Sequence, residues 1–252
     1  MDHRIWKRRH QLDRMTLGSL TLAFFQYPAV WAYLLLAVGS GMLSWRFPSP
    51  LVATLSAVAI SGFVYPLVWY SLHRWVLHSH WMFKSPLTAR VWKRIHYDHH
   101  MDPHHLEVLF GALYTTLPVI ALATIPLGWA IDGLGAATTA FAAGLLLTCG
   151  YEFVHCVEHL PYKPRNRLLA RMKALHLSHH FHDETGNFGI TNFGWDRLFG
   201  TLYERKERPH KSATVFNLGY DEAAAVRYPW VRALSSELAP TREINVQRGR
   251  DA

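Results

Sequence analysis

Residues 47–78 of the chain read FPSPLVATLSAVAISGFVYPLVWYSLHRWVLH. The first 26 of them, from Phe47 to Leu72, contain no charged residue and no histidine. A helix needs about 20 such residues to cross the hydrocarbon core of a bilayer. Aromatic residues gather near the end of the run, as is typical where a helix leaves the membrane: Phe63, Tyr65, Trp69 and Tyr70. The stretch predicts a transmembrane helix that ends in a histidine pair, His73 and His78.

Three further runs also lack charged residues and histidine. They cover Met15 to Trp45, Val108 to Ile131 and Gly133 to Tyr151, with 31, 24 and 19 residues. Pro28 is placed to kink or break the first run, and Asp132-Gly133 predicts a tight turn between the last two. We therefore predict an all-α integral membrane protein with four transmembrane helices in two hairpins, at about 20–45, 49–72, 107–128 and 133–154. The alternative, a soluble all-α protein with buried helices, does not account for runs of this length.

The basic residues are distributed unevenly about these four helices. Two hairpins place residues 1–14, 73–105 and 152–252 on one side of the membrane, and these segments hold 25 of the 26 Lys and Arg residues. The positive-inside rule makes that side cytoplasmic. This topology and anionic headgroups explain the net charge of +8 better than nucleic acid does, and no nucleic-acid motif is present.

The prediction is a single membrane domain over residues 1–252. It has a cytoplasmic N-terminus (1–14), a cytoplasmic helical cap (73–105 and 155–205) and a C-terminal tail without obvious pattern (206–252). Cys149 and Cys156 lie seven residues apart on one predicted helix, too far for an undistorted disulfide, so we expect free thiols. The basic start lacks the cleavage site of a signal peptide.

Ten of the 17 histidines fall into four clusters, in the order pair, triplet, pair, triplet. They are His73, His78, His96, His99, His100, His155, His159, His176, His179 and His180. On a helix, His176, His179 and His180 share one face, and His155 and His159 are one turn apart. One such pair alone is an ordinary core or surface feature. Four clusters in this alternation, all on the same predicted membrane face, predict a shared metal site.

Ten imidazoles are too many for one ion, so the count predicts two ions. Structural zinc sites favour cysteine, whereas imidazole suits Fe, Zn, Cu and Ni. Two redox-active ions at the lipid–water boundary suit O₂ activation, because attack on an unactivated C–H bond needs an oxidant that no amino acid supplies. An acyl chain would reach such a site from the bilayer.

The order of motifs resembles the fatty acid hydroxylase and sterol desaturase superfamily of integral-membrane di-metal oxygenases. The resemblance runs over about residues 60–203. It rests on His73-Arg-Trp-Val-Leu-His78, His96-Tyr-Asp-His-His100, His155-Cys-Val-Glu-His159, His176-Leu-Ser-His-His180 and the loop from Asn187 to Thr201. It implies that the ten histidines bind two iron ions, with zinc possible in purified protein, and that O₂ and two electrons serve to hydroxylate a lipid. Because the haem-domain motif His-Pro-Gly-Gly is absent, we expect a separate electron-transfer protein as donor.

Several alternatives stay open at this stage. A sterol-type desaturase or methyl oxidase, or a carotenoid ring hydroxylase, would carry the same motifs. A metal transporter or sensor would need polar ligands inside the membrane, which the uncharged runs lack. Asp98 and Glu158 are placed either to accept the second N–H of a ligand histidine or to face water. The compact chain favours a bacterial inner membrane, or the endoplasmic reticulum if the source is eukaryotic. The motifs leave the lipid, the carbon attacked and the oligomeric state open.

Overall fold

The structure is a computed structural model that describes residues 10–238. Within this range the chain is helical and contains no β-strand, as predicted. In chain order the helices are α1 (Leu17–Phe24), α2 (Pro28–Arg46), α3 (Leu51–Leu72), α4 (Pro86–Trp92), α5 (Asp98–Met101), α6 (Leu106–Leu109), α7 (Leu113–His159), α8 (Arg167–Phe181), α9 (Gly194–Leu198), α10 (Glu222–Arg227) and α11 (Trp230–Leu238). Two π-helical turns cover His73–Leu77 and Lys93–Tyr97. Of the predicted N-terminus and C-terminal tail, residues 1–9 and 239–252 lie outside the described range.

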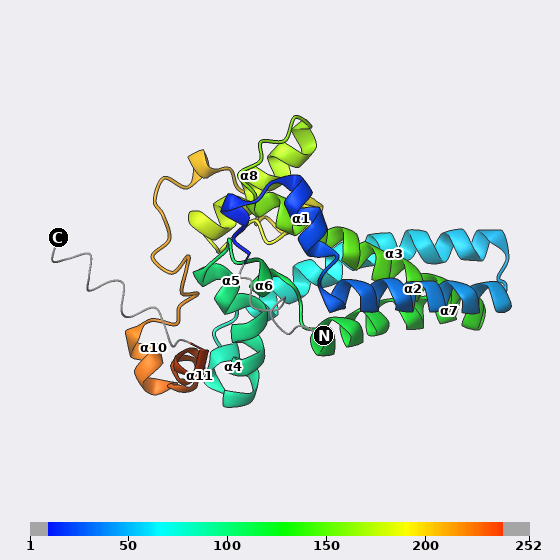
Figure 1. The fold of residues 1–252 in the computed structure, drawn as a ribbon, viewed down its shortest axis with the longest axis horizontal. Helices are drawn as coiled ribbons and strands as arrows, with labels where there is room; N and C mark the ends of the chain where they lie inside the picture. The colour runs from blue at the N-terminus through cyan, green and yellow to red at the C-terminus, as the bar shows by residue number, and fades with distance from the viewer. Residues whose placement is uncertain (1–9, 239–252) are drawn as a thin grey trace.

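Three helical stretches of the described chain are long and apolar enough to cross a membrane. They are Pro28–Arg46, Leu51–Leu77 and Leu106–His159, the last of 54 residues. Helices α2, α3 and α7 pack together and extend away from the shorter helices, toward the right of Figure 1. Large apolar side chains on their outer faces are exposed, among them Leu35, Val52 and Leu122. An exposed apolar surface of this kind suits contact with lipid.

The first apolar run divides into two helices instead of forming one. Pro28 occupies the first turn of α2, where its missing N–H costs nothing, but the same residue cannot continue a helix that precedes it. The separate helix α1 begins at a capping box made by Thr16 and Ser19. The membrane-length helix therefore starts at Pro28, whereas the sequence predicts a span of about 20–45.

The third stretch contains a sharp reversal at Asp132-Gly133. Both residues have non-helical backbone angles, and Gly133 has a φ of 58°, a region that glycine adopts without steric cost. Gly128 lies so close to Ala136 that an added Cβ would sit 2.4 Å from its carbonyl oxygen, and Gly144 is similarly close to Thr124. The arms of α7, residues 113–131 and 134–159, therefore run antiparallel. They correspond to the helices predicted at 107–128 and 133–154.

Small and hydroxyl side chains join α2 and α3 to the two arms of α7. The Tyr33 and Thr116 hydroxyls are 2.6 Å apart, as are those of Ser44 and Thr139. Ala57 of α3 packs against alanines of the second arm in a buried cluster. Small residues allow helices to approach closely, and hydroxyls bond across the contact, as in membrane helix bundles.

The short helices gather at the end of the bundle where α3 and α7 finish (Figure 1). Residues 10–14 form a strap that crosses this end of the bundle. The Leu12 N–H donates to the His104 carbonyl at 2.7 Å, and the Leu106 N–H donates to the His10 carbonyl at 3.1 Å. The described part of the tail also packs here, where the Trp230 indole donates to the Phe83 carbonyl at 2.7 Å. Leu218, Tyr220 and Val231 of the tail are buried in one cluster with Phe83 and Trp92.

Candidate metal centre

The structure brings all ten predicted histidines together at this end of the bundle. Their ring nitrogens form two main groups, within each of which one ligand atom from every residue lies within 4.8 Å of the others. The five-histidine group comprises His99, His155, His159, His176 and His180. The four-histidine group comprises His73, His78, His96 and His100. His179 lies near His100 and His180, between the two.

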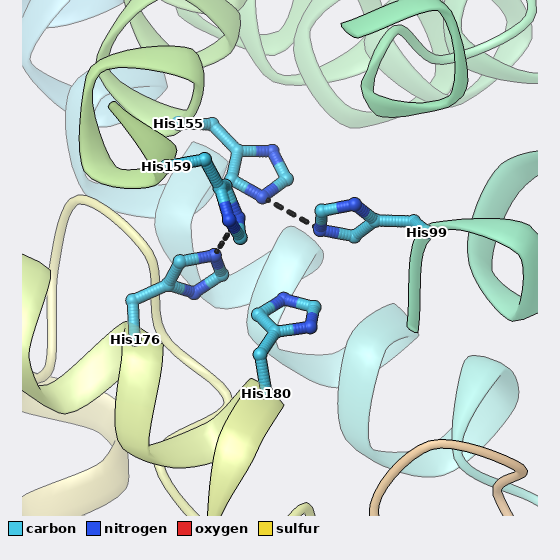
Figure 2. Close-up of side chains that lie close together, drawn as sticks. All are labelled: His99, His155, His159, His176 and His180. Atoms are coloured by element: carbon cyan, nitrogen blue, oxygen red, sulfur yellow. Dashed lines mark hydrogen bonds between the residues drawn. The ribbon is translucent and has the colours of Figure 1, made fainter. Parts of the chain in front are cut away.

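The five-histidine group is built largely on regular α-helix. His155 and His159 lie one turn apart at the end of α7, and His176 and His180 lie one turn apart on α8, so each pair shares a helix face. His99 of α5 completes the group, and Figure 2 shows the five rings converging. The Nε2 atoms of His99 and His155 are 3.1 Å apart, and those of His159 and His176 are 2.9 Å apart.

The four-histidine group depends on two π-helical turns. His73 and His78 are five residues apart, which a regular helix would set about 140° apart. The π-turn over His73–Leu77 closes a hydrogen bond from the His78 N–H to the His73 carbonyl at 3.1 Å, and the wider turn brings the rings onto one side. The Nε2 atoms of His73 and His78 are 3.1 Å apart. His96 lies on the second π-turn, and its Nε2 is 2.9 Å from Nε2 of His78. The five-residue spacing is compatible either with a bend or with two rings that reach opposite sides of the cluster, and the structure has the bend.

Backbone carbonyls hold the outer nitrogens of three ligand candidates. Nδ1 of His73 lies 2.5 Å from the Phe188 carbonyl, that of His179 lies 2.8 Å from the Gly186 carbonyl, and that of His100 lies 3.0 Å from the Val215 carbonyl. A carbonyl only accepts, so each Nδ1 carries the proton and each Nε2 keeps its lone pair for a metal. Such outer contacts orient metal-binding histidines.

Asp196 anchors the loop that supplies the Phe188 carbonyl. Its buried carboxylate accepts from the N–H groups of Phe188 and Gly189, both at 2.8 Å, and from the Thr201 hydroxyl at 2.7 Å. These bonds give Asp196 a structural role in the loop.

The residues present fit two metal ions. Bonds of about 2.0–2.1 Å to imidazole nitrogen set neighbouring ligands at right angles roughly 2.9 Å apart, which matches the Nε2 separations above. Nε2 of His100 and of His179 is buried without a hydrogen-bond partner in the described structure. Burial, followed by neighbouring imidazoles, holds the pKa of His99, His176 and His180 well below the usual value, so these rings are neutral and able to ligate.

Two acidic residues inside the motifs take different positions. Asp98 receives hydrogen bonds from Lys93 at 2.6 and 2.8 Å rather than from a histidine. Glu158 is fully buried, and neither of its oxygens has a hydrogen-bond partner in the described structure. Four further histidines flank the clusters, and the sequence favours an ordinary polar surface position for them: His80, His104, His105 and His182. His182 is instead buried, with Nε2 2.6 Å from the Arg208 carbonyl, so the prediction is wrong for His182.

An apolar cavity of about 210 Å³ reaches both histidine groups from the helix bundle. Its wall includes Val119 of the first arm of α7, Leu72 of α3, His96 of the four-histidine group and His176 of the five-histidine group. A hydrocarbon chain in this cavity would meet both groups. The cavity therefore connects the membrane-length helices to the metal centre.

Glu152 is the one acidic side chain in the wall of this cavity. It is buried; Oε1 accepts from the Gly111 N–H at 3.2 Å, and Oε2 has no partner in the described structure. Glu152 is not among the residues predicted from the sequence. The available signal was an acid that directly ends an uncharged run, one turn before His155.

Residues 58–201 match the family model for fatty acid hydroxylases, which is more than half of the 252-residue chain and includes all ten histidines. The chain belongs to the fatty acid hydroxylase family. The dihydroceramide fatty acyl 2-hydroxylase FAH1 of Arabidopsis thaliana is 29% identical over 196 residues, 77% of this chain and 79% of that protein.

Two other relatives are longer than this chain. The ceramide very long chain fatty acid hydroxylase SCS7 of Saccharomyces cerevisiae is 32% identical over 56% of this chain and 36% of its own length. The fatty acid 2-hydroxylase of Homo sapiens is 30% identical over 60% of this chain and 40% of its own length. A solved structure described as full-length scs7p, with only the hydroxylase domain visible, matches with a TM-score of 0.58 at 26% identity, covering 73% of this chain and 68% of that one. These relatives are eukaryotic and do not support the expectation of a bacterial membrane.

Proposed function

We propose that the protein is a membrane-bound, O₂-dependent di-iron hydroxylase that adds a hydroxyl group to carbon 2 of a fatty acyl chain. The observation that carries the proposal is the apolar cavity that links the membrane-length helices to both histidine groups. The names of the relatives supply the acyl substrate and the carbon. Family membership favours this function over a metal transporter or sensor.

The overall reaction would be R–H + O₂ + 2 e⁻ + 2 H⁺ → R–OH + H₂O, with the electrons delivered by a separate donor protein. Bound iron would supply the redox chemistry that no side chain offers. The ten histidines would hold the two ions. The carbonyls of Phe188, Gly186 and Val215 would fix three of the rings, and the apolar wall would exclude water and position the chain.

We also propose that α2, α3 and the two arms of α7 make four membrane crossings, with the histidines and both termini in the cytoplasm. The reversal at Asp132-Gly133 and the 25 basic residues on one side support this topology. A cysteine introduced beside Arg46 should react with a membrane-impermeant reagent only from the outer side. Reaction from the cytoplasmic side alone would contradict the four-crossing topology.

The function is tested with protein purified in nanodiscs, reconstituted anaerobically with ferrous iron and supplied with a reductant. We expect two ions per chain and, with ¹⁸O₂, an acyl product that has gained one labelled oxygen at carbon 2. The zinc-loaded protein is the matched control and should form none. A product that has lost two hydrogens and gained no oxygen would assign the chain to the desaturases instead.

A further inference from the structure

The cavity beside the histidines is too small for a whole membrane lipid. It encloses about 210 Å³, whereas pockets that bury a drug-sized ligand hold about 300–1,000 Å³. Only the segment of chain near the reacting carbon fits there. The rest of a long substrate needs a second apolar surface that is continuous with the cavity.

A groove of about 800 Å³ on the side of the bundle provides such a surface. It lies between α2, α3 and the second arm of α7, and its wall is mostly apolar, including Val58, Ala143 and Leu147. Phe63 and Leu146, on the same helices, are more than half exposed. In the proposed membrane topology the groove lies among the membrane-crossing helices, where no water is available and hydrocarbon would fill it.

Groove and cavity share the side chains of Tyr65 and Tyr151 in their walls. The ring centroids of these two residues are 5.9 Å apart, and each is 5.9 Å from Trp69, which lines the cavity. The Trp69 indole N–H is buried without a hydrogen-bond partner in the described structure. One layer of aromatic rings therefore separates the two spaces.

We propose that the groove is the membrane-facing binding site for the substrate's hydrocarbon chain. The chain enters sideways from the bilayer and passes between Tyr65 and Tyr151 to reach the histidines. This inference rests on the proposed function and adds to it a route and a second subsite. It commits to a lipid chain rather than a partner helix, because the groove adjoins the catalytic cavity and opens on an apolar face.

Three glycines permit a matched test. Gly62 on α3 and Gly150 on the second arm of α7 both line the groove and are exposed, and an added Cβ at either meets no atom within 4 Å. Gly39, on α2 outside the groove lining, is equally open. Gly150→Phe and Gly62→Phe place a ring in or beside the groove without disturbing helix packing. Gly39→Phe places the same ring elsewhere in the lipid-facing surface.

The variants are compared in nanodiscs by two measurements. One is hydroxylation of a long-chain lipid and of a short-chain analogue that fits the cavity alone. The other is photolabelling by a lipid with a diazirine near the end of its chain. We expect Gly150→Phe to lower long-chain turnover about tenfold or more through KM, to retain short-chain turnover and to lose label from the groove. Gly62→Phe, on the α3 wall of the same groove, should also lower long-chain turnover, and Gly39→Phe should match the unmodified protein.

Normal long-chain turnover and labelling in Gly150→Phe would overturn the proposal, as would an equal loss of both substrates, which would mean that the centre itself is damaged. Failure of the unmodified protein to hydroxylate either substrate would refute the proposed function instead. In that case the photolabelling tests the groove independently of activity. The groove is supported as a binding site if the label attaches to α3 and the second arm of α7 and Gly150→Phe removes it. The groove is refuted as a binding site if the label spreads over the whole lipid-facing surface.

Discussion

The five-histidine group and the four-histidine group carry the same side chain on different backbones. Regular helix orients the first, through one-turn pairs on α7 and α8. The second depends on two π-turns and on carbonyls from distant loops: those of Phe188 and Val215 hold His73 and His100. By contrast, the Nδ1 atoms of His99, His159, His176 and His180 are buried without partners in the described structure. The five-histidine group is therefore placed mainly by regular helix, and the four-histidine group by π-turns together with contacts to distant loops.

The largest expected effect comes from the residue between the groups. His179 lies near His100 and His180, and its ring centroid is 4.8 Å from that of His73. His179→Ala should abolish hydroxylation and lower the metal content, because it removes a ligand without touching the membrane helices. Metal analysis and product mass spectrometry measure both. His210→Ala, at an exposed position outside both groups, should behave like the unmodified protein, and full activity in His179→Ala would contradict a ligand role.

Removing the loop anchor should weaken the four-histidine group selectively. Asp196→Ala leaves the Phe188 and Gly189 N–H groups unpaired and frees the carbonyl that orients His73. Outer contacts of this kind are worth about 10–100-fold in metal affinity, so chelator competition should show one ion released much more readily than the other. Asp221→Ala removes another carboxylate that caps a backbone N–H and should leave both ions unchanged. Equal weakening of both ions would show that the groups are not independently supported.

Acid should affect the two groups alike. Burial, followed by neighbouring histidines, holds the pKa of His96 and His99 well below the usual value, and burial lowers that of His100 to about 3. Because the unfolded chain protonates first, each such histidine lowers stability by about 1.4 kcal/mol per pH unit as pH falls below 6.5, until its folded pKa is reached. Denaturation of metal-free protein between pH 7 and 5 measures this. A flat profile would mean that the rings are not buried in the metal-free state.

The smallest effect is expected at the second π-turn. Lys93 and Asp98 are five residues apart, so the turn brings them onto one side and they pair at 2.6 Å. Asp98→Asn should cost about 1 kcal/mol of stability, because the pair is only partly buried, and should lower metal affinity at His96 only slightly. Thermal unfolding with metal titration measures both. Glu222→Gln breaks an exposed pair with Arg232 and should change neither; an equal effect of the two substitutions would remove any special role for the π-turn.

The sequence predicts the parts of the molecule that depend on local pattern. The ten histidines, the helical class and the reversal at Asp132-Gly133 follow from spacing, hydropathy and turn chemistry. The break at Pro28 was expected as a possibility, but the separate helix α1 was not. The ligand role of the histidines and the side of the membrane stay predictions.

Other features depend on contacts that spacing does not encode. The Val215 carbonyl lies 115 residues from His100, and the strap at Leu12 pairs with His104 across the cap. Glu152 gains its place in the cavity wall only when the arms of α7 come together and Gly111 approaches it. The π-turn at His73 is an intermediate case, because the five-residue spacing showed that a straight helix would separate the two rings but left open whether the helix bends or the rings reach opposite sides of the cluster.

The contact between His100 and Val215 also sets an order of assembly. A ribosome adds about 5–20 residues per second, so roughly ten seconds separate the emergence of His73 from that of Val215. During this interval the growing chain presents incomplete sets of imidazoles at the membrane surface. A chain that stopped just before Val215 would contain every histidine of the centre, yet its His100 would lack the carbonyl that fixes the ring. If the histidines bind metal as proposed, His100 would be oriented for ligation only after Val215 has been synthesised and has packed against it.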